Sequence, residues 1–365
     1  MKIVFSGGGT LGPVTPLIAV IEELRVTAHD DTNTHEILWI GTERGVELPF
    51  LRKLGIEVVT IPSGKLRRYF TWKNFSDIRN SMRGFFAARR ILKEFSPDVV
   101  VSAGGFVSVP VHYAAWSLGI KSVVHQQDVV IGLANKIMSW IATCITVSTE
   151  EHLKKFGGTR NRHVVYTGNP VRSSVLAGNR ETAIELFHLQ PDLATVFVFG
   201  GGTGADAINR VMDAVVRESG GQFQIIHLTG SERRVTPISD VPTYHPYPFF
   251  MGEMAHAYAV ADVVVARAGF NTITEIAAWG KPTILIPMYR SHQEANAAWA
   301  MAHKAAHVVG EMELTSENLL REIREILSNE EKYTQFSDDA RALFPDHACK
   351  RVTAEILGIK TRLAK

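Results

Sequence analysis

Two stretches of the chain decide its fold: Phe5-Ser6-Gly7-Gly8-Gly9-Thr10 and Phe199-Gly200-Gly201-Gly202-Thr203-Gly204. Each follows a short hydrophobic run and precedes an apolar pattern with helical spacing, at 17–24 and at 208–216. Glycines let the backbone turn tightly between a strand and a helix and let a ligand approach it closely. The repetition predicts two Rossmann-like α/β domains in tandem.

Short runs of β-branched residues alternate with longer amphipathic stretches along the chain, as in parallel βαβ units whose helices cover both faces of a sheet. We expect a first domain over 1–168, completed by a C-terminal helix at 347–365, and a second over 169–346. The turn at 167–170 is the expected linker. Strands are predicted at 2–5, 36–40, 58–61, 98–102, 122–124, 144–147 and 163–166, then at 195–199, 224–228, 243–246, 262–266, 283–286 and 307–309.

The composition excludes several classes of protein. Hydrophobic residues make up 45% of the 365 residues and charged residues 21%, which is unlike a disordered, collagen-like or disulfide-rich chain. Two cysteines, Cys144 and Cys349, cannot build a disulfide framework or a four-cysteine zinc site. No apolar run reaches the roughly 18 residues of a membrane span. We therefore expect a protein with no targeting segment and no membrane-spanning helix.

The first glycine stretch also fits the dinucleotide fingerprint, Gly7-x-Gly9-x-x-Gly12. A nicotinamide-binding domain, however, normally ends its second strand with an acidic residue. Here that strand runs into Gly41-Thr42, and Glu43 is displaced. The two loops together predict diphosphate binding rather than an oxidoreductase, while a tight turn without a ligand remains the alternative for either loop alone.

Seven further stretches lie along the chain: 97–110 (with Ser102-Ala103-Gly104-Gly105-Phe106), 114–120, His125-Gln126-Gln127-Asp128, Gly168-Asn169-Pro170-Val171-Arg172, 250–254, 267–275 and His292-Gln293-Glu294-Ala295-Asn296. In order and spacing they resemble the motifs of the MurG family, in glycosyltransferase family 28. These bacterial enzymes transfer N-acetylglucosamine from UDP-GlcNAc to lipid I, the lipid-linked muramoyl-pentapeptide, making lipid II for peptidoglycan. The resemblance covers essentially the whole chain. It implies an inverting hexosyltransferase with the GT-B architecture, two Rossmann-like parallel-sheet domains facing a cleft.

The donor side combines physical reasoning with this resemblance. A helix over 272–278, with Glu275 in its first turn, is predicted after the strand at 262–266, at the carboxyl edge where α/β sheets bind ligands. Glu275 on that helix is suited to accept two ribose hydroxyls, a role that the resemblance also implies, although the helix dipole alone could favour a carboxylate there. Arg172 is suited to the leaving diphosphate as a permanent cation or is a surface arginine of the linker. The resemblance implies further donor contacts from Gly202, Thr203, Phe250, Met251, Thr272, Gln293 and Asn296.

We expect neither a metal ion nor a cofactor in the reaction. Glycosyltransferases that hold a divalent cation on the diphosphate usually need paired carboxylates, and no Asp-x-Asp occurs in the chain. Its fourteen histidines offer no pair at ligand spacing beside carboxylates in an expected cleft. Helix N-termini and Arg172 would then stabilise the departing UDP.

The acceptor side departs from the family. The resemblance places the acceptor diphosphate at Gly8, Gly9, Thr10 and Gly12, with Asn135. The family histidine that is a candidate base is replaced by Pro13, its tyrosine by Phe106, and the serine of its second glycine loop by Gly202. The candidate catalytic groups that remain are Asp128 and His125, the latter alternatively a scaffold residue. A different lipid-linked or polymeric acceptor, or a nucleotide-sugar-binding protein without turnover, are the other interpretations.

A basic segment spans 65–93. It holds nine Lys or Arg residues and one acid, Asp77, which leaves 30 basic and 36 acidic residues in the rest of a chain whose net charge is +2. Phe75, Ile78, Met82, Phe85 and Phe86 recur within it at helical spacing. This pattern indicates peripheral contact with an anionic membrane, or else a helix that packs its apolar stripe on the sheet. The resemblance favours the cytoplasmic face of the inner (plasma) membrane, and no nucleic-acid partner is expected.

Overall fold

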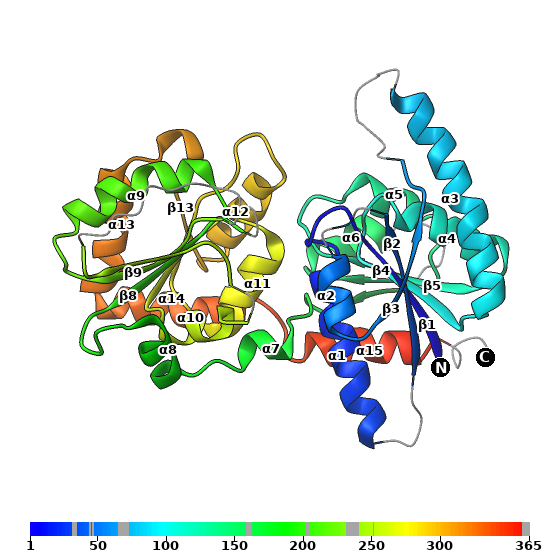
Figure 1. Cartoon of the computed structure of the whole chain (residues 1–365), viewed down its shortest axis with the longest axis horizontal. Coiled ribbons are helices and arrows are strands. Elements are labelled where there is room, and N and C mark those ends of the chain that lie inside the picture. Colours follow the sequence, from blue (N-terminus) through cyan, green and yellow to red (C-terminus); the bar gives the residue numbers. More distant parts are fainter. Residues whose placement is uncertain are drawn as a thin grey trace. The chain divides into compact units, whose positions relative to one another are not determined.

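The computed structural model describes residues 1–30, 35–43, 45, 47–64, 73–157, 163–201, 204–230, 241–250 and 252–359. The chain divides into two compact units, unit 1 (Met1–Arg172 and Pro345–Lys365) and unit 2 (Ser173–Phe344). Each unit contains a parallel sheet with helices on both faces (Figure 1). The predicted α/β class with two parallel-sheet domains is confirmed.

Unit 1 is built on a parallel sheet that has seven strands within the described residues. They are β1 (Lys2–Ser6), β2 (Glu36–Thr42), β3 (Glu57–Ile61), β4 (Val99–Ser102), β5 (Lys121–Gln126), β6 (Cys144–Val147) and β7 (His163–Tyr166). Their order across the sheet is β3-β2-β1-β4-β5-β6-β7. Because the chain adds strands first on one side of β1 and then on the other, the order reverses between β1 and β4. Such a reversal is where open α/β sheets bind ligands.

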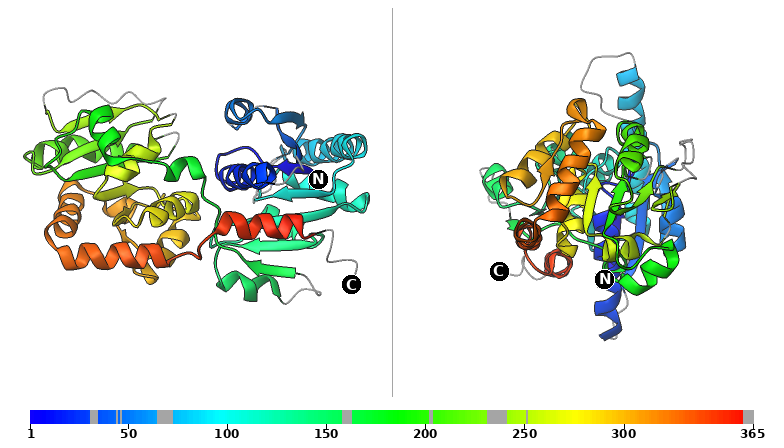
Figure 2. Two further views of the ribbon diagram at one scale, coloured as in Figure 1. Left: turned by 90° about the horizontal axis from the view of Figure 1, so that it is seen from below. Right: turned by 90° about the vertical axis from the view of Figure 1, so that its left-hand side faces the viewer.

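Helices cover both faces of this sheet. They are α1 (Thr15–Asp30), α2 (Leu48–Lys53), α3 (Lys73–Phe95), α4 (Ser108–Ser117), α5 (Leu133–Met138), α6 (Glu151–Gly157) and α15 (Ala348–Leu357). Side chains alternate along β1, so Ile3 and Phe5 pack in a cluster with residues of α1 and α15, whereas Val4 packs with α3 and α4. The C-terminal helix α15 thus belongs to the core of unit 1 and lies against α1 (Figure 2).

Unit 2 repeats this plan with six strands among the residues described. They are β8 (Thr195–Phe199), β9 (Gln224–Leu228), β10 (Tyr244–Tyr247), β11 (Val263–Ala266), β12 (Thr283–Leu285) and β13 (His307–Val308), in the order β10-β9-β8-β11-β12-β13. The order reverses between β8 and β11. The helical segments are α7 (Ser173–Leu176), α8 (Arg180–Phe187), α9 (Asp206–Glu218), α10 (Met254–Val260), α11 (Phe270–Trp279), α12 (Gln293–Ala302), the 3-10 turn η1 (Glu311–Glu313), α13 (Ser316–Ser328) and α14 (Glu330–Ala342).

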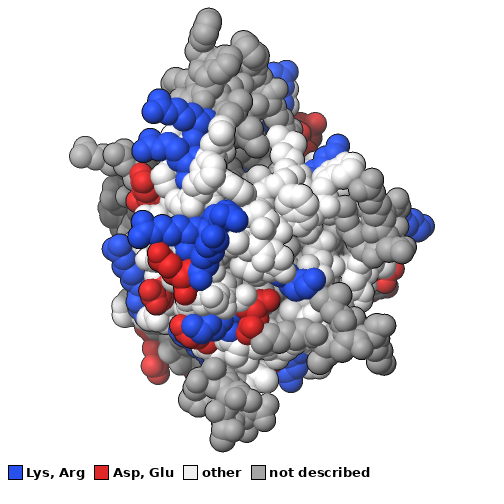
Figure 3. Space-filling view, turned by 90° about the vertical axis from the view of Figure 1, so that its right-hand side faces the viewer, with Lys and Arg blue, Asp and Glu red and all other residues white. Residues whose placement is uncertain are grey.

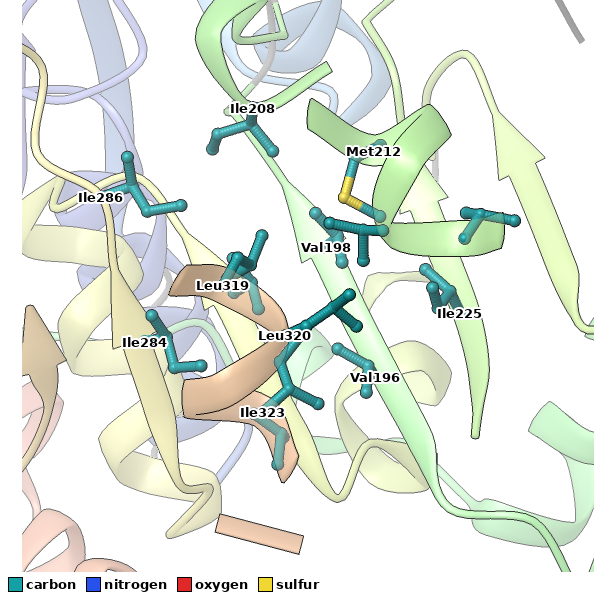
Figure 4. Packing of buried hydrophobic residues seen from close by; sticks show 14 of the residues in the cluster. Val196, Val198, Ile208, Met212, Ile225, Ile284, Ile286, Leu319, Leu320 and Ile323 are labelled. Atoms are coloured by element: carbon teal, nitrogen blue, oxygen red, sulfur yellow. The ribbon is translucent and has the colours of Figure 1, made fainter. Parts of the chain in front are cut away.

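The two faces of the second sheet bury different side chains. On one face α9 and α13 supply residues such as Met212 and Ile323, which pack on Val196 and Val198 of β8 (Figure 4). On the other face Phe197 packs with α8 and α10. Every predicted strand is present, with ends that differ by at most two residues. This agreement follows from the near-continuous hydrophobic runs that a sheet covered on both faces requires.

The junction between the units lies a few residues beyond the expected linker. The units separate at Arg172 and Ser173, and again at Phe344 and Pro345. Residues 167–170 are buried. Asn169 is held by a hydrogen bond to the ring of His125, 3.0 Å between Oδ1 and Nε2, which ties this turn into unit 1.

None of the described helices is long and apolar enough to span a membrane.

Four histidines are buried, and the pKa shifts are large for three of them, His112, His125 and His227. His112 in α4 is fully buried, and neither of its ring nitrogens has a hydrogen-bond partner among the described residues. Burial lowers the pKa of His112 to about 3 and those of His125 and His227 to about 4. Each imidazole is therefore neutral in the folded protein at pH 7.

These histidines predict destabilisation in mild acid. In the unfolded chain a histidine takes up a proton below about pH 6.5. The folded protein does so only near pH 3–4. Between these values the unfolded state binds more protons than the folded one. The free energy of unfolding therefore decreases by roughly 2 kcal/mol per histidine as the pH is lowered from 7 to 5. Urea unfolding at pH 7, 6 and 5 measures the slope. His112→Leu should reduce it, whereas His303→Gln, an exposed position, should not. An equal slope in wild type and His112→Leu would contradict the assignment.

Candidate functional site

Three loops meet at the carboxyl edge of the sheet in unit 1, where the strand order reverses. They follow β1, β4 and β5. Ser108 Oγ donates to the carbonyl of Ser6 at 3.0 Å and to that of Gly104 at 2.8 Å, joining the first two loops. A Cβ added to Gly105 would lie 3.1 Å from the carbonyl oxygen of Gly8. Gly105, with a φ of +89° and no side chain, lets its loop approach the backbone of Gly8 this closely.

The tip of the first glycine loop is exposed. Gly9 has a φ of +89°, and a Cβ there would lie 2.7 Å from Cε1 of Phe106. The side chain of Phe106 therefore lies directly on Gly9. Gly9 and Thr10 are exposed, and Gly12 is partly exposed, so the predicted acceptor loop is accessible. Pro13 occupies the turn just before α1, where a ring-fixed φ is compatible with the start of a helix.

A carboxylate that sequence reasoning missed lies behind this loop. Glu47, not Glu43, is fully buried, and its Oε1 accepts hydrogen bonds from the backbone N–H and hydroxyl of Thr42. A Cβ on Gly8 would lie 2.4 Å from that oxygen. Glu47 lies four residues beyond Glu43, where the second strand has already ended, so spacing from the strand could not single it out.

His125 and Asp128 have very different surroundings. His125 is 1% exposed, and its Nε2 lies 3.0 Å from the Asn169 carbonyl oxygen, which can only accept. Nε2 therefore carries the proton, and Nδ1 accepts from the Thr146 hydroxyl at 2.9 Å. Asp128 is partly exposed in the loop after β5, and its backbone carbonyl accepts from Gln126 Nε2 at 2.6 Å.

Buried amides support this loop from below. Asn135 does not lie on the glycine loop: it is in α5, where its Nδ2 donates to Gln126 Oε1 at 2.7 Å and to the carbonyl of His125 at 3.1 Å. The amide oxygens of Asn135 and Gln127 are buried and have no hydrogen-bond partner among the residues described. Gln127, which sequence reasoning did not select, also lies beside Gly12.

The corresponding edge of unit 2 holds the second glycine loop and the start of α11. Gly200 turns so tightly that a Cβ would lie 2.3 Å from the backbone nitrogen of Ala205. Gly202 and Thr203 lie outside the described residues. Gly269 precedes α11, and Thr272 lies in its first turn, partly exposed. The N-terminus of α11 thus presents backbone N–H groups at the strand-order reversal, an arrangement that favours an anion.

Glu275 lies in the second turn of α11 rather than in the first. It is 8% exposed, and its Oε2 accepts the hydroxyl of Tyr258 at 3.2 Å. The helix dipole acts mainly within the first turn, so it does not account for a buried carboxylate at this position.

Of the remaining predicted donor residues that the structure describes, Phe250 and Asn296 are buried and Arg172 is partly buried. Phe250 is 6% exposed and stacks on Phe187, with ring centroids 5.2 Å apart, so its ring belongs to the core. Met251 lies outside the described residues. Asn296 is buried and donates to the carbonyl of Ala268 at 3.2 Å, which ties α12 to the loop after β11. Arg172 is partly buried at the end of unit 1.

Gln293 is the first residue of α12, and hydrogen bonds to Gln293 and Glu311 hold the loop before it. Gln293 Oε1 accepts the Met288 N–H at 3.0 Å. Glu311 pairs with the guanidinium of Arg267 and accepts the Tyr289 N–H at 2.7 Å. Burial alone would raise the pKa of Glu311, but these two hydrogen bonds, together with the positive charges of Arg267 and Arg210, outweigh it and lower that pKa. Glu311 lies 44 residues from Arg267, and no motif marked the pair.

The predicted apolar stripe of the basic segment is divided between two faces. Residues 65–72 and the side chains of 73–78, with Phe75 and Ile78, lie outside what the structure describes. In the rest of α3, Phe85 packs on a core cluster, whereas Met82 and Phe86 are 59% and 65% exposed. Arg79 and Arg83 are exposed on the same helix. The exposed face therefore combines apolar and basic side chains.

Comparison with known proteins assigns the chain to a family. The chain matches the glycosyltransferase family 28 N-terminal domain over residues 3–147 and the glycosyltransferase family 28 C-terminal domain over residues 195–351. It is 36% identical over 336 residues to the UDP-N-acetylglucosamine--N-acetylmuramyl-(pentapeptide) pyrophosphoryl-undecaprenol N-acetylglucosamine transferase of Lachnospira eligens, covering 91% of this chain and 92% of the relative. It is 34% identical to the Listeria welshimeri enzyme of that name over 371 residues, covering 98% and 99%.

Solved structures share the fold. The crystal structure of Acinetobacter baumannii MurG superposes with a TM-score of 0.73 at 24% identity, covering 98% of this chain and 99% of that one. UDP-GlcNAc 2-epimerase from Neisseria meningitidis, bound to UDP-GlcNAc, gives a TM-score of 0.72 at 16% identity, covering 98% and 100%. With both domain models and relatives of 34–36% identity matched along its length, the chain belongs to glycosyltransferase family 28, as its motifs predicted.

Proposed function

We propose that the protein transfers N-acetylglucosamine from UDP-GlcNAc to a lipid-linked muramoyl-pentapeptide acceptor, with inversion at the sugar C1. The reaction is the one named for relatives that align with almost the whole chain. The observation that carries the donor side is Glu275, a buried carboxylate on the helix that begins at the strand-order reversal of unit 2.

Unit 2 holds the donor in this proposal. Glu275 accepts the ribose hydroxyls, and the N–H groups at the start of α11, with Thr272, bind the diphosphate. Gln293 contacts the sugar hydroxyls from a loop that Glu311 braces, and Asn296 holds α12 in place. Because the Phe250 ring is in the core, the uracil contact would come from its backbone. Arg172 would neutralise charge on the leaving UDP.

Unit 1 holds the acceptor. The loop at Gly8–Gly12 offers the exposed backbone of Gly9 and Thr10 at the strand-order reversal to the acceptor diphosphate, while Gly8 itself is buried. Asp128 takes the proton of the attacking acceptor hydroxyl. At the same time the oxygen of that hydroxyl bonds to C1 of the sugar, and the bond from C1 to UDP breaks. Asp128 is the better base because it is partly exposed. His125 has both ring nitrogens occupied and a pKa lowered by burial to about 4, and so acts as a positioning residue.

UDP release tests the proposal. With purified protein and UDP-GlcNAc we expect release of UDP when lipid I is added, and only background release with water as acceptor. Release with another lipid-linked saccharide but not with lipid I would favour the acceptor change that Pro13 and Phe106 first suggested. UDP-GlcNAc binding without release under any acceptor would favour a non-catalytic protein.

Two variants separate the roles of the two units. Asp128→Asn should reduce kcat by roughly 10²–10⁴-fold, because a general base is lost, and should leave UDP affinity unchanged. Glu275→Gln should weaken UDP binding by about tenfold or more, because a charged hydrogen-bond acceptor is lost. Turnover assays and calorimetry with UDP measure the two effects. Normal turnover in Asp128→Asn would remove the base assignment, and normal UDP affinity in Glu275→Gln would remove the ribose contact.

We further propose that α3 makes peripheral contact with an anionic membrane. Met82 and Phe86 are exposed near Arg79 and Arg83, and an amphipathic helix of this kind binds at the lipid–water interface. Figure 3 shows, on one face of unit 1, a broad uncharged area bordered by Lys and Arg side chains, with some acidic side chains among them. A lipid-linked acceptor requires the enzyme to reach such a surface.

Vesicle sedimentation checks the membrane contact. Wild-type protein should bind vesicles with phosphatidylglycerol more tightly than neutral ones, and added salt should reduce the difference. Met82→Ser with Phe86→Ser should lower binding to both kinds, whereas Arg79→Gln with Arg83→Gln should lower only the anionic preference, by roughly tenfold. Met312→Ser, an exposed methionine in unit 2, is the control. Equal binding of wild type to neutral and anionic vesicles would exclude the electrostatic part.

A further inference from the structure

A second group of chemically reactive side chains lies in unit 1, away from the glycine loops. Cys144 and His163 are the first residues of β6 and β7, and they face each other in the register of this parallel pair. Both therefore lie at the amino edge of the sheet, opposite the edge where the proposed acceptor site lies. The C-terminal helix α15 packs on the same face and places Glu355 beside them.

The three side chains converge closely. His163 Nε2 lies 2.9 Å from Glu355 Oε2, and Cys144 Sγ lies 3.7 Å from the same oxygen. All three ligand atoms lie within 4.8 Å of one another, the one such group of His, Cys, Asp and Glu found in the described part of the chain. Around a tetrahedral zinc ion, ligand atoms are about 3.3–3.6 Å apart, given bonds of about 2.0–2.3 Å. The two printed separations lie within about half an ångström of that range, and the third, between Cys144 Sγ and the His163 ring nitrogen, is at most 4.8 Å.

We propose that Cys144, His163 and Glu355 bind a divalent transition-metal ion of the zinc class. A thiolate, an imidazole and a carboxylate form a donor set that suits zinc or cobalt rather than the oxygen-preferring magnesium or calcium. Three protein ligands leave a fourth position for water. The Cys144 thiol would release its proton on binding.

The burial of the ligands favours a structural ion, while the open fourth position is the coordination typical of catalytic zinc. Cys144 is 2% exposed and the Glu355 side chain 12%, so two ligands are held inside the packing of α15 against the sheet. The His163 side chain is 46% exposed and leaves a route for the ion. An ion here would link two neighbouring strands, β6 and β7, to the helix α15, whose Glu355 lies 192 residues beyond His163 in the chain. It would tie α15 to unit 1.

Cobalt provides a direct readout. Apo protein titrated with Co²⁺ should develop a thiolate-to-cobalt absorption band and the visible bands of tetrahedral cobalt, at one equivalent, and Zn²⁺ should displace them. Zn²⁺ should raise Tm, and Mg²⁺ should not. Cys144→Ala, which suits its buried site, should abolish the thiolate band. His163→Gln and Glu355→Gln should each weaken Zn²⁺ binding by roughly tenfold or more.

Two controls match the ligands. Cys349→Ser changes the other cysteine, on α15 itself, whose thiol pKa burial raises to about 11. His307→Gln breaks the His307–Glu322 pair of unit 2, 2.6 Å apart, which is also a histidine–glutamate contact. Both variants should bind Co²⁺ as wild type does. A wild type without a thiolate band, or a band that persists in Cys144→Ala, would overturn the proposal and leave a hydrogen-bonded cluster.

Discussion

The close approach of two backbones at the strand-order reversal of unit 1 is the contact on which the proposed acceptor site depends. Gly8 and Gly105 come from loops nearly a hundred residues apart, and a side chain on Gly105 would meet the Gly8 carbonyl at 3.1 Å. Ser108 fastens the same two loops with paired hydrogen bonds. The exposed tip at Gly9 and Thr10 therefore belongs to a loop that Ser108 joins to its neighbour.

Unit 2 has the same topology and, in the proposed function, binds a different ligand. Its strand order also reverses beside the first strand, but the helix that begins there, α11, carries a buried carboxylate in its second turn. The Arg267–Glu311 pair then holds the neighbouring loop in place through the Tyr289 N–H. In the proposed function, one architecture provides two anion-binding edges, and the side chains around each edge separate a nucleotide-sugar role from an acceptor role.

Much of the fold could be predicted because its signals are local. Hydrophobic runs such as 99–102 and 263–266 must be strands when both faces are covered, and every predicted strand is present. The glycine loops were predicted for the same reason, since a tight turn after a strand requires glycine at particular positions. The motif-bearing helix that carries Glu275 was also predicted, although its start was placed too late by two residues.

The sequence by itself determined the α/β class, the strands, the glycine turns and the family, because each depends on residues close together in the chain. Only the tertiary structure decided which polar groups are buried and with what partners. Both ring nitrogens of His125 form hydrogen bonds inside unit 1, and the Phe250 ring packs in the core. Glu47, rather than Glu43, lies beside the first glycine loop. The tertiary structure also gathered Cys144, His163 and Glu355 at one place. Contacts between residues so far apart in sequence depend on how the sheet and its helices pack, and no local pattern records that packing.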